Sequence, residues 1–401
     1  MKILHTSDWH LGRTLHGASL EDAHRQFLDL LVDTVVAEGV GAVLISGDLF
    51  DRAVPSVTSL RLARDALTRL AGHARVIVTP GNHDSGDRLG LTDPFLNDRL
   101  IIRSQPTDAD RPIDLIEEGR AVARVYPLPY LDPDMTRTVL VDEAGDIAQG
   151  ADATHQLARS HQAVVAAAAR RIRRHLADHP VPDGARVIIM AHAFLTGGEA
   201  SDSERPIEVG GVDNAAASTL TTLDGGGAGL VDYVAAGHLH RPQAIADADA
   251  IVRYSGSPVA FSFSEANDAK SMVLLDTAAP DLGIRLIPVP AWRRLERISA
   301  TLDQIEAGQF SQASDAWCEV SITDDHRPDQ LIARVRRVLP YALVIHHRPA
   351  NPVSVWRPSV SPTESATPVE QAWEFAATVG NRPLTDAEKA VWQSVFEEVG
   401  K

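Results

Sequence analysis

The chain has 401 residues, 44% of them hydrophobic and 23% charged, which is typical of a folded protein with two or three domains. A formal net charge of −16 argues against a protein that binds nucleic acid through a basic surface of its own. The single cysteine, Cys318, excludes an internal disulfide framework and a cysteine-rich zinc site. With neither a signal-peptide pattern nor a membrane-spanning apolar run, we expect a cytoplasmic protein.

The first part of the chain alternates apolar runs with segments of helical spacing. Such alternation predicts βαβ crossovers and a largely parallel sheet. The apolar face of the second predicted helix, residues 56–71, packs either inside the chain or against a second copy of the chain. The predicted strands are 1–11, 42–46 and 75–79, and the predicted helices are 21–38 and 56–71.

The middle of the chain contains further strands and one long helix. That helix, predicted over 154–179, carries four arginines near its end, which either contact phosphates or form a solvated face. Residues 141–154 form a predicted loop. The predicted strands are 122–126, 186–190 and 233–236, and segments 251–255, 271–276 and 284–290 are expected to form a second sheet layer.

The composition changes after Pro290. A helix is predicted over 295–306, followed by a strand at 317–322, a helix at 328–338 and a strand at 343–346. Residues 348–368 are rich in proline, serine and threonine, which predicts a linker. Two short helices follow, with capping boxes at Thr367–Glu370 and Thr385–Glu388. Their apolar faces dock either on a partner or on this chain itself.

Five of the apolar runs end in side chains that bind metals or phosphate. The first run leads into Asp8-Trp9-His10, and residues i and i+2 of an extended chain face the same side. Because open α/β sheets place ligands beyond the carboxyl ends of their strands, we expect these side chains to converge. They are Asp8, His10, Asp48, Asn82, His83, His192, His238 and His240.

These side chains offer imidazole nitrogens and oxygens, a mixture that suits manganese, iron or zinc better than calcium. Without His83, the set is large enough to hold two ions, which at about 3.5–4 Å apart can clamp a phosphorus centre. Asp48, central in the order of strands, is the expected bridging carboxylate. His83 is then left to steady the phosphate or to protonate the leaving oxygen.

Each of these residues also has a simpler explanation. The chain has sixteen histidines, and any one of them is more often a hydrogen-bonded core or surface residue than a metal ligand. Asp51 could cap the following helix, and Asp84 could only orient a neighbouring histidine. The argument for a site therefore depends on the five strand ends together.

In this order, the motifs resemble the signature of the calcineurin-like metallophosphoesterase superfamily, over residues 1 to about 240. They are Asp8-x-His10, Gly47-Asp48-x-x-Asp51, Gly81-Asn82-His83-Asp84, His192 and Gly237-His238-x-His240. Within it, the chain most resembles the SbcD family of bacterial nuclease subunits, over nearly its whole length. That resemblance includes Asp8-Trp-His-Leu-Gly-Arg13, Gly47-Asp-Leu-Phe-Asp-Arg-Ala-Val-Pro55, Gly237-His-Leu-His-Arg-Pro-Gln243 and Tyr254-Ser-Gly-Ser-Pro258.

The resemblance implies a two-layered β-sheet sandwich flanked by helices, with a small α+β capping domain and a C-terminal helical tail. The implied domains are a nuclease domain at 1–280, a capping or DNA-binding domain at 281–350, a linker at 351–366 and an ATPase-binding helix-loop-helix at 367–401. It also implies two metal ions, with manganese typically supporting activity. The implied ligand sets are Asp8, His10, Asp48 and His240 for one ion, and Asp48, Asn82, His192 and His238 for the other.

The same resemblance implies that His83 is the catalytic histidine. Archaeal and eukaryotic relatives have a second histidine where this chain has Asp51, so that second role is not carried over. The implied activity is 3′-to-5′ exonuclease cleavage of duplex DNA ends and endonuclease cleavage, including at hairpins. The implied partner is an SbcC-type SMC ATPase, two of each subunit, which would offer the basic DNA surface that a chain of charge −16 lacks. A homodimer through the nuclease domain is also expected.

Two other functions remain open from the sequence. A small-molecule phosphodiesterase or phosphatase could use the same two metals, and the acidic charge favours it. The roughly 120 C-terminal residues beyond the core, more than half a typical domain, argue against it. A non-catalytic scaffold is the third interpretation, which the complete ligand set disfavours.

Overall fold

The computed structural model describes residues 1–91, 93, 98–141, 156–205, 207, 214–246, 248–350, 367–379 and 382–399. The chain divides into two compact units. One consists of Met1–Arg297 with Asp315–Cys318, and the other of Ile298–Ser314 with Glu319–Lys401. In the described part of the chain, no helix is long and apolar enough to cross a membrane.

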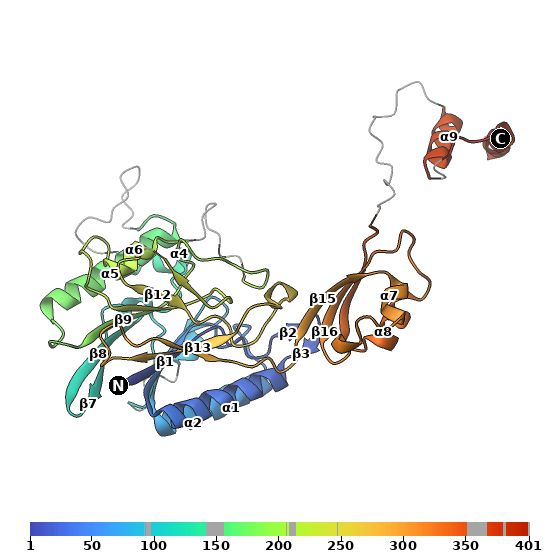
Figure 1. Ribbon diagram of the computed structural model, residues 1–401. Coiled ribbons are helices and arrows are strands. Elements are labelled where there is room, and N and C mark those ends of the chain that lie inside the picture. The colour runs from blue at the N-terminus through green and yellow to red at the C-terminus, as the bar shows by residue number, and fades with distance from the viewer. Residues whose placement is uncertain are drawn as a thin grey trace. The chain divides into compact units, whose positions relative to one another are not determined.

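The first unit contains two six-stranded sheets (Figure 1). The first sheet has the order β14-β13-β1-β4-β5-β6, in which β1, β4, β5 and β6 run parallel. Its strands are β1 (Lys2–Thr6), β4 (Val40–Ser46), β5 (Arg75–Thr79), β6 (Leu100–Ile102), β13 (Ser271–Asp276) and β14 (Arg285–Pro288).

The second sheet has the order β11-β12-β10-β9-β8-β7, with parallel strands at its centre and an antiparallel strand at each edge. Its strands are β7 (Ile113–Glu117), β8 (Arg120–Pro127), β9 (Arg186–His192), β10 (Tyr233–Gly237), β11 (Gln243–Ile245) and β12 (Ile251–Tyr254). The described part of this unit also contains a short hairpin of β2 (Thr14–Leu15) and β3 (Ala18–Ser19).

The two sheets pack face to face. One buried cluster joins Ile3, Leu44 and Ile77 of the first sheet to Met190 and Tyr233 of the second. Helices cover the outer faces, because each sheet also buries a second apolar side against them. This arrangement confirms the predicted two-layered sandwich flanked by helices.

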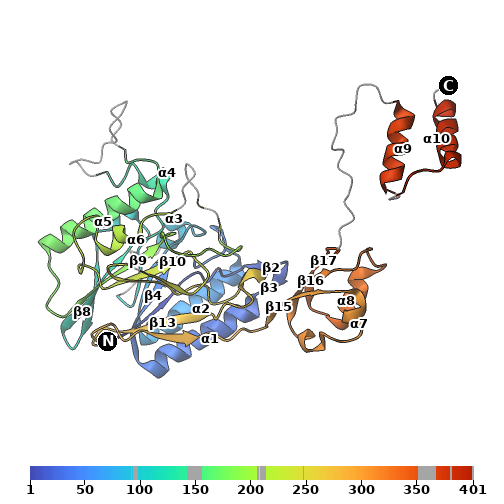
Figure 2. The same cartoon turned by 45° about the horizontal axis from the view of Figure 1, so that its top comes forward.

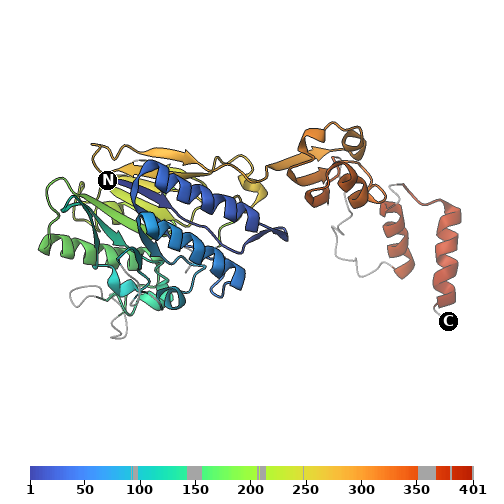
Figure 3. The ribbon, with the colours of Figure 1, turned by 90° about the horizontal axis from the view of Figure 1, so that it is seen from below.

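Helices α1 (Glu21–Glu38) and α2 (Val57–His73) lie side by side on the first sheet (Figure 3). The chain leaves α1 at Gly39, whose φ of 63° is costly for residues other than glycine. Helix α2 begins after Ser56, whose side chain accepts a hydrogen bond from the N–H of Ser59. The second sheet is covered by α5 (His161–Asp178) and α6 (Ala217–Thr221), and short helices α3 (Gly86–Gly90) and α4 (Pro133–Thr136) lie in connections.

Two details of the elements predicted for this unit are wrong. Helix α5 begins at His161 after the cap Ser160, whereas the prediction began at 154, and most of the predicted loop at 141–154 lies outside the described residues. Strands β13 and β14 extend the first sheet instead of forming a separate layer. Leu275 pairs with Ile3 and is buried like its neighbour Leu274, so an apolar run does not reveal which sheet it joins.

The second unit is built on a three-stranded sheet, β15-β16-β17, with two helices. Its elements are β15 (Leu295–Ala300), α7 (Leu302–Glu306), β16 (Trp317–Ile322), α8 (Leu331–Val338) and β17 (Ala342–His347). The predicted helix over 295–306 is therefore wrong. Ile298 and Ala300 are buried and alternate with exposed residues, and a capping box at Thr301 and Gln304 starts the helix only there.

Helices α9 (Pro368–Val379) and α10 (Asp386–Val399) form a pair (Figure 2). Both predicted capping boxes form: Glu370 and Thr367, and likewise Glu388 and Thr385, exchange hydrogen bonds. The Nε1–H of Trp373 donates to the carbonyl of Lys389 at 3.3 Å, which joins the two helices. Residues 351–366 of the predicted linker lie outside the described residues.

Candidate metal centre

The side chains predicted to converge lie together at the carboxyl ends of β1, β4 and β5 in one sheet and of β9 and β10 in the other. Three groups have donor atoms within 4.8 Å of one another. They are Asp8 with His10 and His240, His10 with Asp48 and His83, and Asp8 with Asp48 and His192. Since the groups share Asp8, His10 and Asp48, they form one centre.

Several of these residues have a backbone conformation that is rare outside glycine. The φ angles are 54° at Asp8, 44° at His10, 49° at Asp48 and 103° at His238. Conformations of this kind cost of order 1–3 kcal/mol each and concentrate at functional sites. The loops after β1 and β4 stabilise each other through backbone hydrogen bonds. The N–H of Asp8 donates to the carbonyl of Gly47 at 3.1 Å, and the N–H of His10 donates to the backbone carbonyl of Asp48 at 3.0 Å.

Glycines allow the loops to approach this closely. A Cβ on Gly81 would lie 2.1 Å from Oδ1 of Asp48, and one on Gly47 would lie 2.1 Å from Nδ1 of His192. A Cβ on Gly237 would lie 2.0 Å from the carbonyl oxygen of Ser46. Gly81 is therefore required where two loops of the first sheet meet, and Gly47 and Gly237 where the two sheets meet.

One half of the centre gathers around Asn82. Its Oδ1 lies 2.9 Å from Nε2 of His192 and 3.1 Å from Nδ1 of His238. Nε2 of His192 is also 3.3 Å from Oδ2 of Asp48, while Nδ1 of the same ring contacts the carbonyl of Ser46 at 3.0 Å. The carbonyl of Ser46 thus orients the ring so that Nε2 faces the centre.

The other half gathers around His10. Its Nε2 lies 3.1 Å from Nε2 of His240 and 3.5 Å from Oδ2 of Asp48. Asp8 is held beside them, since the N–H of His238 donates to both of its carboxylate oxygens at 3.0 and 3.1 Å. Asp48 thus faces both halves, as a bridging carboxylate must.

Burial dominates the electrostatics of the centre. Burial raises the pKa of Asp8 to about 7. Burial also opposes ionisation of Asp48, but the imidazole of His192 outweighs it and holds the pKa of the carboxyl well below the usual range. Burial lowers the pKa of His10 and His240 far below the ordinary value. These two imidazoles are therefore neutral and can offer lone pairs.

The other two histidines respond in opposite ways. Burial and the neighbouring His192 lower the pKa of His238 to about 3. Burial would also lower the pKa of His192, but the carboxylates of Asp48 and Asp8 outweigh it and raise the pKa to about 9. The single protonated imidazole thus lies where the negative charge is greatest, which is where a cation would be most stable.

The donor set fits divalent cations. The two carboxylates and four imidazoles are exposed by 4% or less, and Asn82 is half-buried. Their donor atoms face one another. Among the described residues, Nδ1 of His10 and Nδ2 of Asn82 are buried polar atoms without a hydrogen-bond partner. Oxygen and nitrogen donors of this mixture suit manganese, iron or zinc.

His83 lies at the edge of the centre and is only half-buried. Its Nδ1 contacts the carbonyl oxygen of Asp51 at 2.9 Å, and its ring packs edge-on against that of His10. Its backbone N–H donates to Oδ1 of Asp48 at 2.8 Å. The ring is thereby fixed beside the centre while part of it remains accessible.

The two acidic residues predicted to support the site have different surroundings. The carboxylate of Asp51 lies 3.9 Å from Nδ1 of His10 and 3.8 Å from Nε of Arg13. Asp84 contacts backbone groups, not the ring of a histidine. Its carboxylate accepts hydrogen bonds from the N–H groups of Leu49, Phe50 and Gly81 at 2.9–3.0 Å, so it ties the loop after β4 to the loop after β5.

Sequence reasoning missed the residues behind His240. Ser203, Glu265 and Lys270 form a buried row of hydrogen bonds that ends at this histidine. Ser203 lies in a polar run whose pattern indicates only a loop, and Glu265 and Lys270 lie between strands of different sheets. Only the fold brings them together.

Three of the four arginines of α5 bind within the protein. Arg170 pairs with Asp224 at 2.6 Å, and Arg173 donates to the carbonyl of Leu223 at 3.2 Å. Arg171 donates to the carbonyl of Val139 at 3.4 Å. These contacts favour a structural role over a phosphate-binding one.

Comparison with known proteins identifies the family. Residues 1–242 match the calcineurin-like phosphoesterase family. The chain belongs to this family. Its members are phosphoesterases that hold divalent metals, which confirms the resemblance predicted from the motifs. Residues 291–370 match a second family, described as the type 5 capsule protein repressor C-terminal domain.

A curated relative of this calcineurin-like phosphoesterase is the D component of the nuclease SbcCD of Bacillus subtilis (strain 168). The two are 33% identical over 360 residues, which cover 87% of this chain and 85% of the relative. Among solved structures, TT1561 of Thermus thermophilus aligns with 72% of this chain and 99% of its own, at 13% identity and a TM-score of 0.39. GAP50 of Plasmodium aligns with 72% and 89%, at 9% identity and a TM-score of 0.38.

Proposed function

We propose that this chain is the metal-dependent DNA nuclease subunit of a complex with an SMC-type ATPase. The observation that carries the proposal is the gathering of carboxylate, amide and imidazole donor atoms with His83 beside them, in a chain 33% identical to a nuclease subunit. The proposed activities are 3′-to-5′ exonuclease cleavage of duplex DNA and endonuclease cleavage, including at hairpins.

In the proposed mechanism, two sets of residues hold the two cations. Asp8, His10, Asp48 and His240 form one set, and Asp48, Asn82, His192 and His238 form the other. Two divalent ions held there, which we propose to be manganese, would lower the pKa of a bound water and offset negative charge on the phosphate. The buried residues exclude bulk water and keep the donor atoms in place.

His83 has a separate task in this mechanism. Its Nδ1–H can donate to the carbonyl of Asp51. In the imidazolium form Nε2 also carries a proton, which it can donate to the phosphate or transfer to the leaving oxygen. Asp84 acts at a distance by holding the loops that carry Asp48 and Asn82. Asp51 is proposed to keep His83 in place through its carbonyl group.

The alternative function is that of a small-molecule phosphodiesterase or phosphatase, which the net charge of −16 favours. A direct comparison separates the two. We expect the protein with manganese to cleave hairpin and linear duplex DNA and to leave a cyclic nucleotide intact, with and without the partner ATPase. Hydrolysis of the cyclic nucleotide with no DNA cleavage under either condition would establish the alternative.

We propose further that residues 281–350 cap the nuclease domain and contact DNA. Residues 367–401 are proposed to bind an SbcC-type ATPase. The proposed complex contains two of each subunit and works in the cytoplasm. The match of 291–370 to a second family supports a separate C-terminal domain. Apolar side chains that remain exposed on α9 and α10, among them Phe375 at 55% and Val391 at 63%, support a partner for this helix pair.

A second copy of the chain is the proposed occupant of a groove beside α2. The groove has a volume of about 660 Å³, and its apolar lining includes Leu49, Phe50, Val54, Leu60 and Leu67. Leu60 is 47% exposed although it lies on a helix whose other leucines are buried. We expect Leu60→Glu to lower the mass measured by light scattering to that of one chain; an unchanged mass would exclude this interface.

A further inference from the structure

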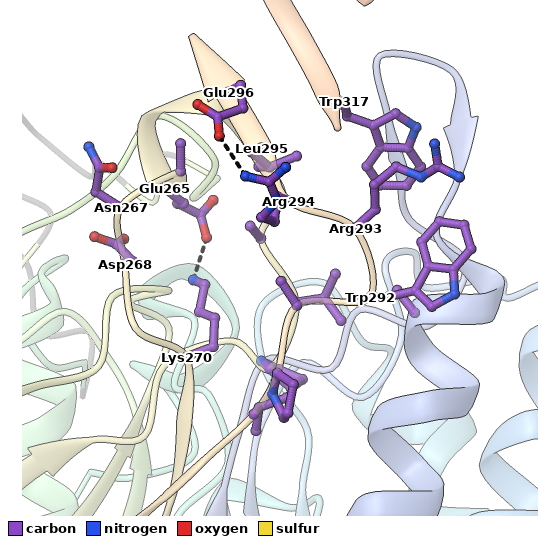
Figure 4. A pocket seen from close by; sticks show the side chains of 18 residues that line it. Glu265, Asn267, Asp268, Lys270, Trp292, Arg293, Arg294, Leu295, Glu296 and Trp317 are labelled. Carbon is purple, nitrogen blue, oxygen red and sulfur yellow. Dashed lines mark hydrogen bonds and ion pairs between the residues drawn. The ribbon is translucent and has the colours of Figure 1, made fainter. Parts of the chain in front are cut away.

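Behind His240 lies a buried row of polar side chains outside the sequence motifs. Oγ of Ser203 contacts Nδ1 of His240 and lies 2.6 Å from Oε1 of Glu265. Oε2 of Glu265 lies 2.5 Å from Nζ of Lys270. These four residues are exposed by 8% or less, so the hydrogen bonds form away from water, where they are strong. Figure 4 shows the Glu265–Lys270 pair at the wall of a cavity of about 230 Å³.

The chemistry of these groups fixes the direction of each hydrogen bond. Glu265, paired with an ammonium group, can only accept. Ser203 has one hydroxyl hydrogen, which must therefore point to Glu265. The oxygen of Ser203 therefore faces His240 with a lone pair, and Nδ1 of His240 must carry the proton of this hydrogen bond. Nε2 of His240 is then unprotonated, and this is the atom that lies 3.1 Å from Nε2 of His10.

The backbone of His240 is held on both sides by the same surroundings. Its N–H donates to Oε1 of Glu204 at 2.7 Å, and its carbonyl accepts a hydrogen bond from Nζ of Lys270 at 2.8 Å. Lys270 also donates to Oγ of Ser257 at 3.0 Å. The position of the residue and the tautomer of its ring are therefore set by one connected network.

We propose that Ser203, Glu265 and Lys270 are positioning residues that hold His240 in the Nδ1-protonated tautomer, with Nε2 free to bind a divalent cation. The inference rests on the proposed function, since a metal ligand is what requires this nitrogen to be unprotonated. If the network were only structural, its loss would lower the stability of the fold and leave the tautomer and the affinity for metal unchanged.

The test is Ser203→Ala, with manganese binding to the full-length protein measured by titration calorimetry. We expect one of two manganese ions to bind roughly 10- to 100-fold more weakly, as is usual when a partner behind a ligand is lost, and the other to change little. Ser203→Thr keeps the hydroxyl and should bind both manganese ions with the affinity of the wild type. Ser394→Ala is the control, because that hydroxyl donates within α10, to the carbonyl of Val391.

Long-range ¹H–¹⁵N spectra of the metal-free protein give a second measurement. We expect His240 to carry its proton on Nδ1 in the wild type and to gain the Nε2-protonated form in Ser203→Ala. Should that variant fail to fold by circular dichroism, Glu265→Gln removes the carboxylate that orients the hydroxyl and should weaken the same ion.

The outcomes separate this inference from the proposed function. If the wild type and the folded variants bind two ions equally tightly with the same tautomer, the positioning role is overturned and the nuclease proposal stands. If the wild type binds two ions and cleaves no DNA, the nuclease proposal fails while the positioning role is judged by the binding data. A wild type that binds no manganese would overturn both.

Discussion

Asp48 combines contacts from both halves of the centre in a single side chain. Oδ2 lies 3.3 Å from His192 and 3.5 Å from His10, while Oδ1 accepts the backbone N–H of His83. One carboxylate thus contacts the residues proposed for each cation and for the leaving group. Its burial costs free energy that nearby imidazoles offset, and two divalent cations would offset it further.

His83 is the residue whose removal should affect chemistry without affecting metal. We expect His83→Ala to lower the rate of DNA cleavage in manganese by roughly 10²- to 10⁴-fold, the usual contribution of a general acid. The manganese content should remain that of the wild type, because the proposed ligands are other residues. Cleavage rate and metal content are measured on the same preparation.

His179→Ala, which changes an exposed histidine after α5, is the control for this substitution. A His83→Ala protein that cleaves DNA at the wild-type rate would remove His83 from the mechanism. If the variant instead loses manganese, His83 acts as a metal ligand. This outcome is compatible with the structure, because the donor atoms of His83, His10 and Asp48 lie within 4.8 Å of one another.

At the scale of elements, the site depends on how closely the loops after β4 and β5 approach. Gly81 is the closest point, since a Cβ there would lie 2.1 Å from Oδ1 and 2.4 Å from the backbone nitrogen of Asp48. Backbone atoms cannot move aside as a flexible side chain can. Asp84 holds the same two loops through three backbone hydrogen bonds, so neither loop can shift alone.

We therefore expect Gly81→Ala to lower the free energy of unfolding by about 1–3 kcal/mol, the usual cost of overpacking, and to weaken manganese binding. Gly72→Ala is the matched control. A Cβ there meets nothing within 4 Å, and an alanine inside helix α2 should stabilise the protein by about 0.5–1 kcal/mol. Chemical denaturation and calorimetry measure both effects; a Gly81→Ala protein with wild-type stability and affinity would contradict the role of close approach.

The sequence predicts most of the elements that position the site. Helix α1 and strand β16 have the predicted bounds, and the apolar runs before Asp8 and Asp48 are strands. Strand pairing could not be predicted in the same way, because the sequence of an apolar strand such as β13 does not indicate which strand it pairs with. The contacts of Asp84 with three backbone groups, and of Ser203 with His240, depend on loops that meet only in the folded chain.

At the scale of the whole molecule, charge constrains how the protein can hold DNA. The chain carries a formal net charge of −16, which two divalent cations reduce but do not reverse. Positive charge from another molecule should therefore strengthen the binding of a DNA substrate, since phosphate contacts dominate affinity for DNA. The proposed ATPase partner would supply it, and the helix pair α9 and α10 offers the apolar surface through which the partner could be bound.

The last prediction concerns this helix pair. Deleting residues 365–401 should abolish co-purification with the ATPase and leave the manganese-dependent nuclease activity of the remaining chain near its original rate, because the proposed ligands all lie before residue 241. Val391→Asp and Phe396→Asp, which place a charge on exposed apolar positions of α10, should weaken co-purification at least tenfold. Gln393→Asp adds the same charge at an exposed polar position and should change little. If the truncated chain still co-purifies, the helices pack on this chain itself and the partner binds elsewhere.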